Sequence, residues 1–480
     1  MDQPHNEAQP VKPQLGLWDA VSIIIGIVIG AGIYESPWLI FSNVPNVWMG
    51  LVIWVIGGLL ALVGALCYAE LATTYPREGG DYVYLTRAFG PWVGFLFGWA
   101  QLAVILTGSI GAMAYVFAKY AAGIWNLGEG LIVALAMLAV VVLSVLNLLG
   151  VVFGKGVQNL LTAAKVLGLG GIVVAGFFHG QPQKWAAGDS QPGIGWGALA
   201  IILVLYTYGG WNDAAFVAAE VREPRRNIPR ALLLGTGSIM LIYLLVNAAY
   251  LLGLGFEEAR KPGNIAARLL ENTGGSAGAT GISVLVMISA LGALNGLIFT
   301  GSRVYSTLGS EHSVFAWLGQ WHPRLGVPHW SLLVQALIAL TMIAVVGTTE
   351  GQQVIDQVLT AAGLQGINWE KYGGGFGTLV SGTAPVFWLF FLLTGLSLFA
   401  LREKDRHLTR PFAVPFYPFL PFIFCLMCVY MLYKSTEWAE WLALFGVVPL
   451  LIGVPLYFVS TRRAAVEKLP SAAATSPARY

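Results

Sequence analysis

Paired glycines interrupt two otherwise apolar stretches, and each interruption offers backbone groups that could bind a ligand. Residues 29–33 read IGAGI, and residues 206–213 read YTYGGWND. Each glycine in a helix interior costs about 1 kcal/mol relative to alanine, so two close together favour a break. A helix that restarts after Gly32 presents free N–H groups and a positive dipole end, which suit a carboxylate. A helix that stops near Tyr208 presents free carbonyls, which suit an ammonium group. The two ends together are complementary to a zwitterion.

An alternative explanation is that these glycines only let helices pack closely, as small residues do in membranes. Unwound backbone within a bilayer is tolerated only where it is buried in protein or lines a cavity. Two breaks at matching positions in the two halves of a chain are the pattern that indicates a transporter site. We therefore predict a ligand site near the middle of the membrane.

Three ionisable residues lie in or beside apolar runs. Lys165 is about eight residues, or roughly 12 Å, into its predicted helix. A lysine at that depth marks a functional site unless it snorkels to the interface, and its charge argues against sodium coupling. Asp213 follows the second break directly, and Glu35 follows the first. Both carboxylates are candidates for recognising a polar or basic substrate side chain or for moving a proton. Lys165 is also a candidate for moving a proton. Alternatively, each carboxylate faces an outer vestibule or pairs with a nearby base.

The composition excludes a soluble protein. Charged residues make up 10% of the 480 residues, hydrophobic residues make up 57%, and the mean hydropathy is +0.71. A soluble domain could not bury that much apolar surface, and a net charge of +2 offers no basic face for nucleic acid. The cysteines and histidines lack metal spacing, and no Walker motif or nucleophile elbow occurs, so no metal, cofactor or enzymatic activity is expected.

These properties predict an all-α polytopic membrane protein with twelve transmembrane helices. Eighteen Lys and Arg residues fall in the connections on the side of the amino terminus and seven on the other side, which places both termini in the cytoplasm. A cytoplasmic tail is expected over 1–14 and a disordered one over 461–480. Outside, a short helical pattern occurs at 265–270, and 348–375 is expected to cover a vestibule. The predicted spans are 17–41, 48–73, 89–118, 131–149, 157–178, 196–219, 231–255, 282–308, 330–347, 376–401, 418–433 and 441–459.

Five motifs occur in an order that resembles the amino acid–polyamine–organocation superfamily. Three are general: GAGI at 30–33, YPREGGDY at 75–82 and GGWN at 209–212. Two resemble the L-type amino acid transporter branch: EVREPRRNIP at 220–229 and NGLIFTGSR at 295–303. The likeness runs from about residue 15 to 459. Glu220 and the basic run after it suit a cytoplasmic gate, or they are ordinary positive-inside anchors.

The resemblance implies a five-plus-five inverted repeat, with a first repeat over 15–180, a second over 195–401, and two further helices over 414–460. It implies that the substrate carboxylate meets the N–H groups of Ala31 and Gly32, and that its amine meets carbonyls at Val28, Tyr206 and Gly209. By the same resemblance, Tyr206 lies where the family has an aromatic gate over the substrate, and Asn212 lies where the family has a polar residue beside the site. Lys165 resembles a lysine that replaces the bound cation of sodium-coupled relatives. The expected substrate-binding set is Val28, Gly30, Ala31, Gly32, Ile33, Tyr206, Tyr208, Gly209 and Asn212.

The function expected from this likeness is sodium-independent secondary transport of amino acids across the plasma membrane, by exchange or proton coupling. A polyamine or amine carrier is the alternative within the fold, and it would depend more on Glu35 and Asp213. A channel or a lipid enzyme is a weaker alternative. Animal members join a single-span partner through a Cys in the loop after the third span. Residues 120–130 contain no Cys, so the resemblance implies a stand-alone permease, of a bacterial inner membrane, without a disulfide-linked heavy chain.

Overall fold

The computed structural model describes residues 14–467 apart from 78, 129, 179 and 181–197. Within that part of the chain the regular structure is helical, except for one isolated bridge between Leu15 and Val221. Helices dominate because a chain within a bilayer must satisfy its backbone N–H and C=O groups internally. Three predicted segments lie partly outside the described residues: residues 1–13 of the tail over 1–14, residues 468–480 of the tail over 461–480, and the start of the span at 196–219.

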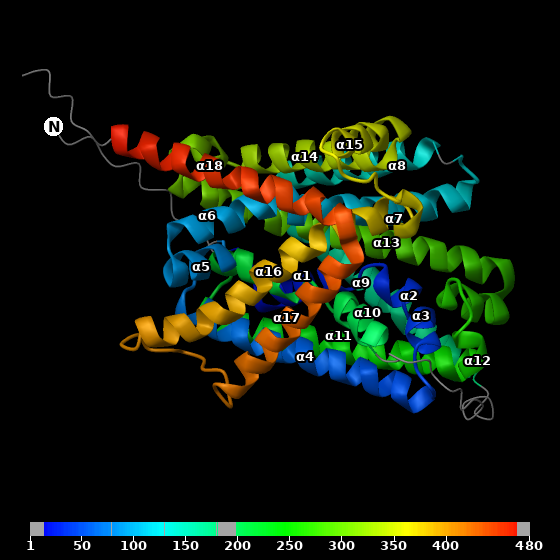
Figure 1. The fold of residues 1–480 in the computed structure, drawn as a ribbon. Helices are drawn as coiled ribbons and strands as arrows, with labels where there is room; N and C mark the ends of the chain where they lie inside the picture. The colour runs from blue at the N-terminus through cyan, green and yellow to red at the C-terminus, as the bar shows by residue number, and fades with distance from the viewer. Residues whose placement is uncertain (1–13, 78, 129, 179, 181–197, 468–480) are drawn as a thin grey trace, which may run out of the picture.

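The helices pack against one another in a single bundle (Figure 1). Their bounds are α1 Leu17–Val28, α2 Gly32–Glu35, α3 Pro37–Ser42, α4 Val47–Thr74, α5 Asp81–Phe89, α6 Pro91–Ala100, η1 Gln101–Ile105, α7 Leu106–Trp125, α8 Gly130–Leu148, α9 Val151–Phe178, α10 Ala198–Thr207, η3 Trp211–Glu220, α11 Pro224–Leu254, α12 Phe256–Ala259, α13 Ile265–Glu311, η4 Ser313–Gly319, α14 His329–Gly347, α15 Thr349–Ala361, η5 Trp369–Tyr372, α16 Gly375–Lys404, α17 Phe419–Ala439, η6 Glu440–Ala443 and α18 Leu444–Glu467.

Nine segments of the described chain are long and apolar enough to cross a membrane. One of them, Phe419–Thr461, holds both α17 and α18. The first and sixth predicted spans fall on shorter pieces, α1 to α3 and α10 with η3, because each is interrupted. The chain is therefore a multi-span helical membrane protein.

Helix boundaries differ from the predicted ones where polar residues extend an apolar core. The helix α11 begins at Pro224 rather than at 231, since proline is preorganised for a first helical turn. The predicted short helix at 265–270 is the start of α13, which turns at Gly275. The expected disordered tail from 461 is wrong for its first seven residues: α18 continues to Glu467 through alanines that favour helix.

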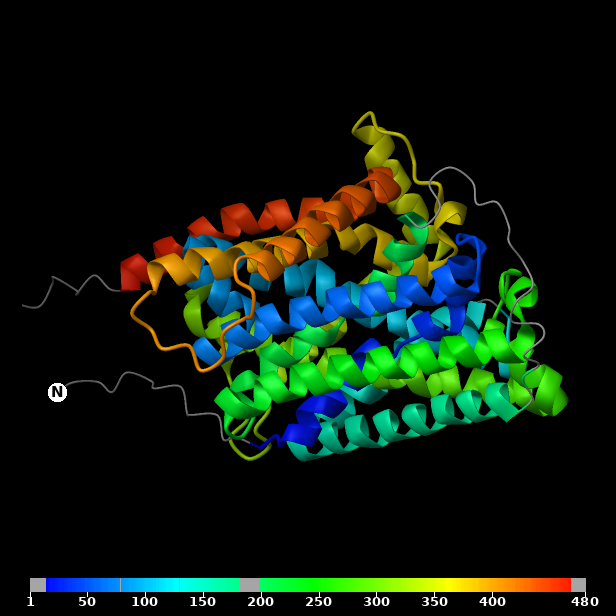
Figure 2. The ribbon, with the colours of Figure 1, turned by 90° about the horizontal axis from the view of Figure 1, so that it is seen from below.

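The helices run roughly parallel to one long direction, and their connections gather at two ends (Figures 1 and 2). One end carries α5 and the end of α18, together with basic connections such as that after Lys404. We call it the inner end, because basic loops mark the cytoplasmic side. The opposite end carries α12 and α15 and is called the outer end. The interrupted α1 packs among α9, α11, α13 and η3, so it lies inside the bundle.

Candidate functional site

The first break exposes three consecutive backbone amides. Helix α1 ends at Val28, and the Gly30 N–H donates to the Val28 carbonyl at 2.8 Å, which closes a tight turn. Helix α2 then restarts at Gly32. Within the described residues, the N–H groups of Ala31, Gly32 and Ile33 have no hydrogen-bond acceptor. Free amides at a helix start attract anions, so this break can bind a carboxylate.

The second break lies directly against the first. Helix α10 ends at Thr207, and Gly210 takes a φ of 104° before the 3₁₀ helix η3. A Cβ on Gly210 would lie 2.7 Å from Ile27, and one on Gly32 would lie 2.9 Å from Thr207. Glycine is required at both positions by this close approach, and at Gly210 also by its positive φ.

A tyrosine on α11 ties the two breaks together. The hydroxyl of Tyr243 is 3.0 Å from the carbonyl of Val28 and 3.2 Å from that of Thr207, and it is fully buried. One hydroxyl proton can be donated to only one carbonyl at a time, so the second carbonyl keeps acceptor capacity. The Val28 carbonyl already accepts from the Gly30 N–H, so it can accept a bond from a ligand while the Tyr243 hydroxyl donates to the Thr207 carbonyl.

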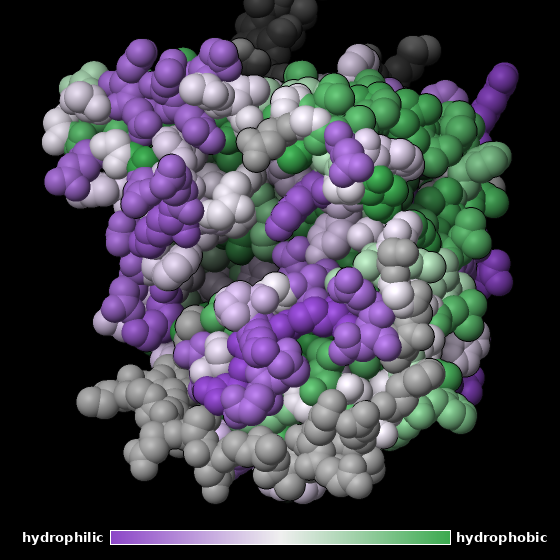
Figure 3. Space-filling model, turned by 90° about the vertical axis from the view of Figure 1, so that its right-hand side faces the viewer, coloured by the Kyte–Doolittle hydropathy of each residue, from purple (hydrophilic) through white to green (hydrophobic). Residues whose placement is uncertain are grey.

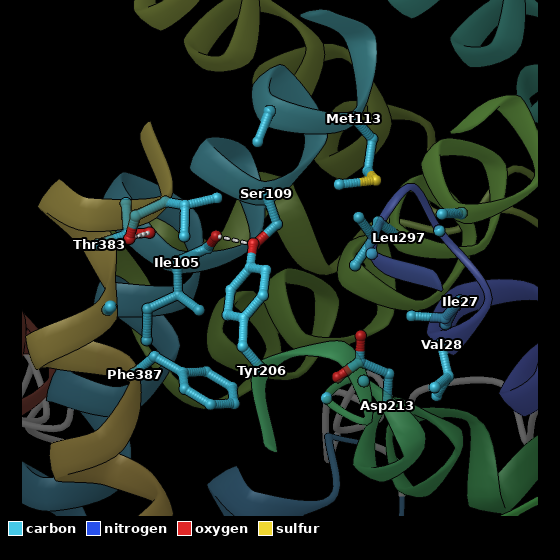
Figure 4. A pocket seen from close by; sticks show the side chains of 18 of the residues that line it. Ile27, Val28, Ile105, Ser109, Met113, Tyr206, Asp213, Leu297, Thr383 and Phe387 are labelled. Carbon is cyan, nitrogen blue, oxygen red and sulfur yellow. Dashed lines mark hydrogen bonds between the residues drawn. The ribbon is translucent and has the colours of Figure 1, made fainter. Parts of the chain in front are cut away.

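A cavity of about 160 Å³ opens between the two breaks, a size that suits a small solute. Seven residues of the expected substrate-binding set line it: Val28, Gly30, Ala31, Gly32, Tyr206, Gly209 and Asn212. Asp213, a candidate for specificity or proton movement, lines it as well. Figure 4 shows Tyr206 extending into the cavity, with the carboxylate of Asp213 across from Phe387. The Tyr206 side chain presents much of its surface to the cavity, whereas Asp213 is only 5% exposed at the cavity floor.

Two predicted residues, Ile33 and Tyr208, are not part of the lining. The Tyr208 ring packs on Trp54 and Tyr243, and its hydroxyl bonds the Trp54 carbonyl at 3.2 Å. Ile33 is fully buried. The prediction from the motif missed this because adjacent residues on a helical turn point in different directions.

Glu35 also lies outside the cavity lining. Its carboxylate accepts a hydrogen bond from the Tyr120 hydroxyl at 2.7 Å and is 3.9 Å from the ammonium of Lys119. Asn264 donates to the same Tyr120 hydroxyl. Glu35 therefore joins α2 to α7 and to the start of α13 near the outer end.

Lys165 is fully buried behind the first break. Its ammonium donates to the carbonyls of Gly26 at 2.8 Å, Ile29 at 2.7 Å and Ser289 at 2.9 Å. An ammonium group has three donors and all three are used. Lys165 thus satisfies carbonyls that the end of α1 leaves free and ties α1 to α13.

Four further elements supply cavity residues that the motifs did not reveal. The lining includes residues of η1 and α7, α13 and α16, namely Gln101, Ile105, Leu106, Ser109, Ala112, Met113, Ala293, Leu297, Phe376, Val380, Thr383, Ala384, Phe387 and Trp388. Of these residues, only Gln101 could have been suspected from the sequence, because a lone side-chain amide in an apolar run must lie in a polar environment. Its Oε1 is buried without a hydrogen-bond partner among the described residues.

The inner end is closed beneath the cavity by a buried ion pair. Glu220 at the end of η3 accepts from the Arg303 guanidinium at 2.6 and 3.3 Å, and both side chains are 1% exposed. The backbone of Leu15 pairs with residues 220–222 beside them. The outer end, in contrast, is hollowed and rimmed by hydrophilic side chains (Figure 3). This conformation is accordingly open outward and sealed inward.

A second ion pair holds the connection after α16 at the inner end. Asp405 accepts from the Arg87 guanidinium at 2.9 Å and from the Tyr75 hydroxyl at 2.7 Å. The bonds from Arg87 lower the pKa of Asp405 to about 2. A carboxylate whose pKa is depressed in the folded state stabilises it above the ordinary pKa of about 4 and loses that contribution as the pH falls toward 2.

We expect Asp405→Asn to lower the free energy of unfolding by about 1 kcal/mol at pH 7, because Arg87 is partly exposed and solvent weakens the pair. The melting temperature in detergent should fall by a few degrees. The difference from wild type should shrink as the pH is lowered from 5 toward 3. A difference that is constant over this range would contradict the role of the charge.

Within the described residues, no group of three or more His, Cys, Asp and Glu side chains could hold a metal ion. The cavity instead offers amide donors at one break, carbonyl acceptors at the other, and one carboxylate at its floor. That arrangement can bind a small molecule carrying both charges, and it holds no set of groups arranged for bond-making chemistry.

The chain is similar to known proteins along most of its length. Residues 15–461 match the family described as amino acid permease. The chain is 28% identical over 417 residues to the serine/threonine exchanger of Bacillus subtilis, covering 86% of this chain and 89% of that protein. It is 30% identical over 414 residues to the human b(0,+)-type amino acid transporter 1, covering 84% and 79%. Over 412 residues it is 30% identical to the mouse large neutral amino acids transporter small subunit 2, covering 80% and 77%.

Proposed function

Because the chain belongs to the amino acid permease family, whose members are transporters, we propose that it carries amino acids by alternating access, without sodium, through the cavity between its two helix breaks. The observation that carries this proposal is the pairing of free amides at Ala31 and Gly32 with carbonyl groups at the second break, around one small cavity. The two sets are complementary to the two charged groups that all free amino acids share.

In the proposed complex, the substrate carboxylate accepts bonds from the amides of Ala31 and Gly32. Its ammonium donates to the carbonyls of Val28, Tyr206 and Gly209. Tyr206 extends across the cavity and acts as the gate over the bound substrate. The opposite charges of the helix ends favour this orientation over the reverse.

The proposed architecture is twelve spans in a five-plus-five inverted repeat, with repeats over 15–180 and 195–401 and two further helices over 414–460. The two interrupted helices then occupy equivalent first positions in the repeats. Lys165 fills the place of a coupling cation with a fixed ammonium, which supports independence from sodium. We further propose a plasma-membrane location, in bacteria the inner membrane, with both termini cytoplasmic and no covalently linked heavy chain.

A second candidate is an amine or polyamine carrier. Asp213 favours it, because an amine without a carboxylate could bind this buried carboxylate at the cavity floor. The free amides at the first break favour amino acids instead, since an amine would leave them unpaired.

The test is uptake of labelled serine and threonine into proteoliposomes, chosen because a relative exchanges them. Uptake should be equal in sodium and choline buffers, and competition should require both the amino and the carboxyl group. Faster uptake into preloaded vesicles would define exchange. Strict dependence on sodium, or competition by amines alone, would contradict the proposal.

One variant probes the carboxylate site directly. Gly32→Ala should weaken the apparent substrate affinity by about tenfold, because the added Cβ lies 2.9 Å from Thr207 and displaces an amide that bonds a charged group. Gly123→Ala is the matched control: its Cβ would meet no atom within 4 Å. Unchanged affinity in Gly32→Ala would place the carboxylate elsewhere.

A further inference from the structure

Two buried carboxylates lie between the cavity and the inner end. Asp213 lines the cavity floor, and Asp81 is the first residue of α5. They are 5% and 2% exposed. The charge of Asp81 reaches Asp213, and the Gly79 N–H donates to the Phe216 carbonyl at 3.4 Å. The start of α5 packs directly on η3, since a Cβ on Gly80 would lie 3.0 Å from the backbone of Ala215.

Buried polar atoms without hydrogen-bond partners surround this pair. The hydroxyls of Tyr68 on α4 and Thr394 on α16 face Asp81. Among the described residues, neither hydroxyl has a hydrogen-bond partner, and the same holds for Asp81 Oδ1 and Asn212 Oδ1. The Tyr68 and Thr394 side chains are at most 1% exposed. Leaving a buried polar atom unbonded is unfavourable, so this compartment is arranged for a ligand that supplies a proton or a positive charge.

No base in the part of the chain that the structure describes neutralises either carboxylate. The titratable neighbours on the packed elements are tyrosines, from α4, α5 and α13, with Cys428 of α17 behind Tyr68. Nearby arginines are paired with other acids: Arg303 with Glu220, Arg87 with Asp405, and Arg402 with Glu70. All three N–H donors of the Lys165 ammonium bond to backbone carbonyls.

We propose that Asp213 and Asp81 together bind one proton and carry it across the membrane with the substrate. The inference rests on the proposed function and deepens it by assigning the coupling ion and its site. Two carboxylates within electrostatic reach of each other in a low-dielectric interior do not both ionise, so binding one proton removes their repulsion. Asp213 takes the proton from outer water through the cavity. When the inner seal opens, Asp81 releases it to the cytoplasm.

The proton rather than a metal ion is the ligand, because two carboxylates are too few for a metal site. The described residues offer no third acid, His or Cys beside them. Lys165 is not the coupling group, because its ammonium is fixed by three short bonds. The proton thus enters at a site separate from the residue that replaces the cation.

A spectroscopic experiment tests the protonation itself. The full-length protein in lipid nanodiscs at pH 7 should show the infrared carbonyl band of a protonated carboxylic acid. Asp81→Asn and Asp213→Asn should each remove that band. Tyr68→Phe should shift the band, and this variant provides the test if an Asn variant does not fold. Glu35→Gln is the control and should leave it, since Glu35 accepts from Tyr120 beside Lys119. A band absent from wild type, or unaffected by all three variants, would overturn the proposal.

Two transport measurements distinguish a wrong proton site from a wrong assignment of amino acid transport. Counterflow and pH-driven accumulation of labelled serine are measured in the same vesicles. One coupled proton supports at most roughly tenfold accumulation per pH unit. Wild type should approach this value, and Asp81→Asn, normalised to its own counterflow, should fall to a ratio of one. Wild-type counterflow without pH-driven accumulation would overturn the proton site alone. Absent counterflow would overturn amino acid transport, and accumulation driven by sodium would assign the pair to that ion.

Discussion

Lys165→Ala is expected to reduce amino acid uptake on the order of 100-fold. The substitution removes three charged hydrogen bonds and leaves the carbonyls of Gly26, Ile29 and Ser289 buried without their donor. Each such bond contributes about 1.5–3 kcal/mol, and a loss of about 2.7 kcal/mol already corresponds to a factor of 100. The end of α1 should therefore shift, and the amides of the first break should no longer be held in place to bind the substrate.

The control for this variant is Lys155→Met on the same helix. Lys155 bonds the Gln14 carbonyl and is 3.4 Å from Asp19, and it is partly exposed at the inner end. Removing this pair should cost at most about 1 kcal/mol and leave uptake within a few-fold of wild type.

The proposed role of Lys165 as a replacement for a cation leads to a second expected result for the same variant. The cavity left by Lys165→Ala is lined by three carbonyls, so sodium or lithium should restore part of the uptake in a concentration-dependent manner. Uptake at the wild-type level in choline buffer would show that the ammonium is dispensable and would refute the assignment.

The second large effect concerns the seal at the inner end. Arg303→Met should destabilise the outward-open, inward-closed conformation by about 3–5 kcal/mol, because it leaves the Glu220 carboxylate buried and unpaired. A cysteine introduced at Ala218, which is fully buried on η3, should then react faster with an impermeant maleimide in inside-out vesicles. Background labelling is low, since the three native cysteines are buried and free.

Two further variants show whether the buried charge is responsible. The double variant with Glu220→Gln removes the unpaired charge, so most of the stability and the slow labelling should return. Arg260→Met breaks an exposed pair with Glu257 at the outer end and should change stability by less than about 1 kcal/mol. Equal effects of Arg303→Met and Arg260→Met would contradict a specific seal at Glu220.

The sequence alone determined the properties that depend on local residue types. An apolar run of spanning length must become a helix in a bilayer, so the helices could be located, and glycine pairs at 30–32 and 209–210 marked the two breaks. The family was recognisable from motifs, since these lie in contiguous stretches. Lys165 was detectable because a charge in an apolar run requires a partner, although the run does not reveal which partner it has.

Tertiary structure decided everything that depends on residues distant in the chain. The acceptors of Lys165 come from α1 and α13, and the cavity wall comes from α7, α13 and α16, so no local pattern could name them. Only packing turned Tyr208 away from the cavity, joined Glu35 to Tyr120, paired Arg303 with Glu220, and brought Asp81 within electrostatic reach of Asp213. The reason is physical: sequence fixes which groups cannot remain alone in a low-dielectric interior, while the arrangement of helices selects the group that each one meets.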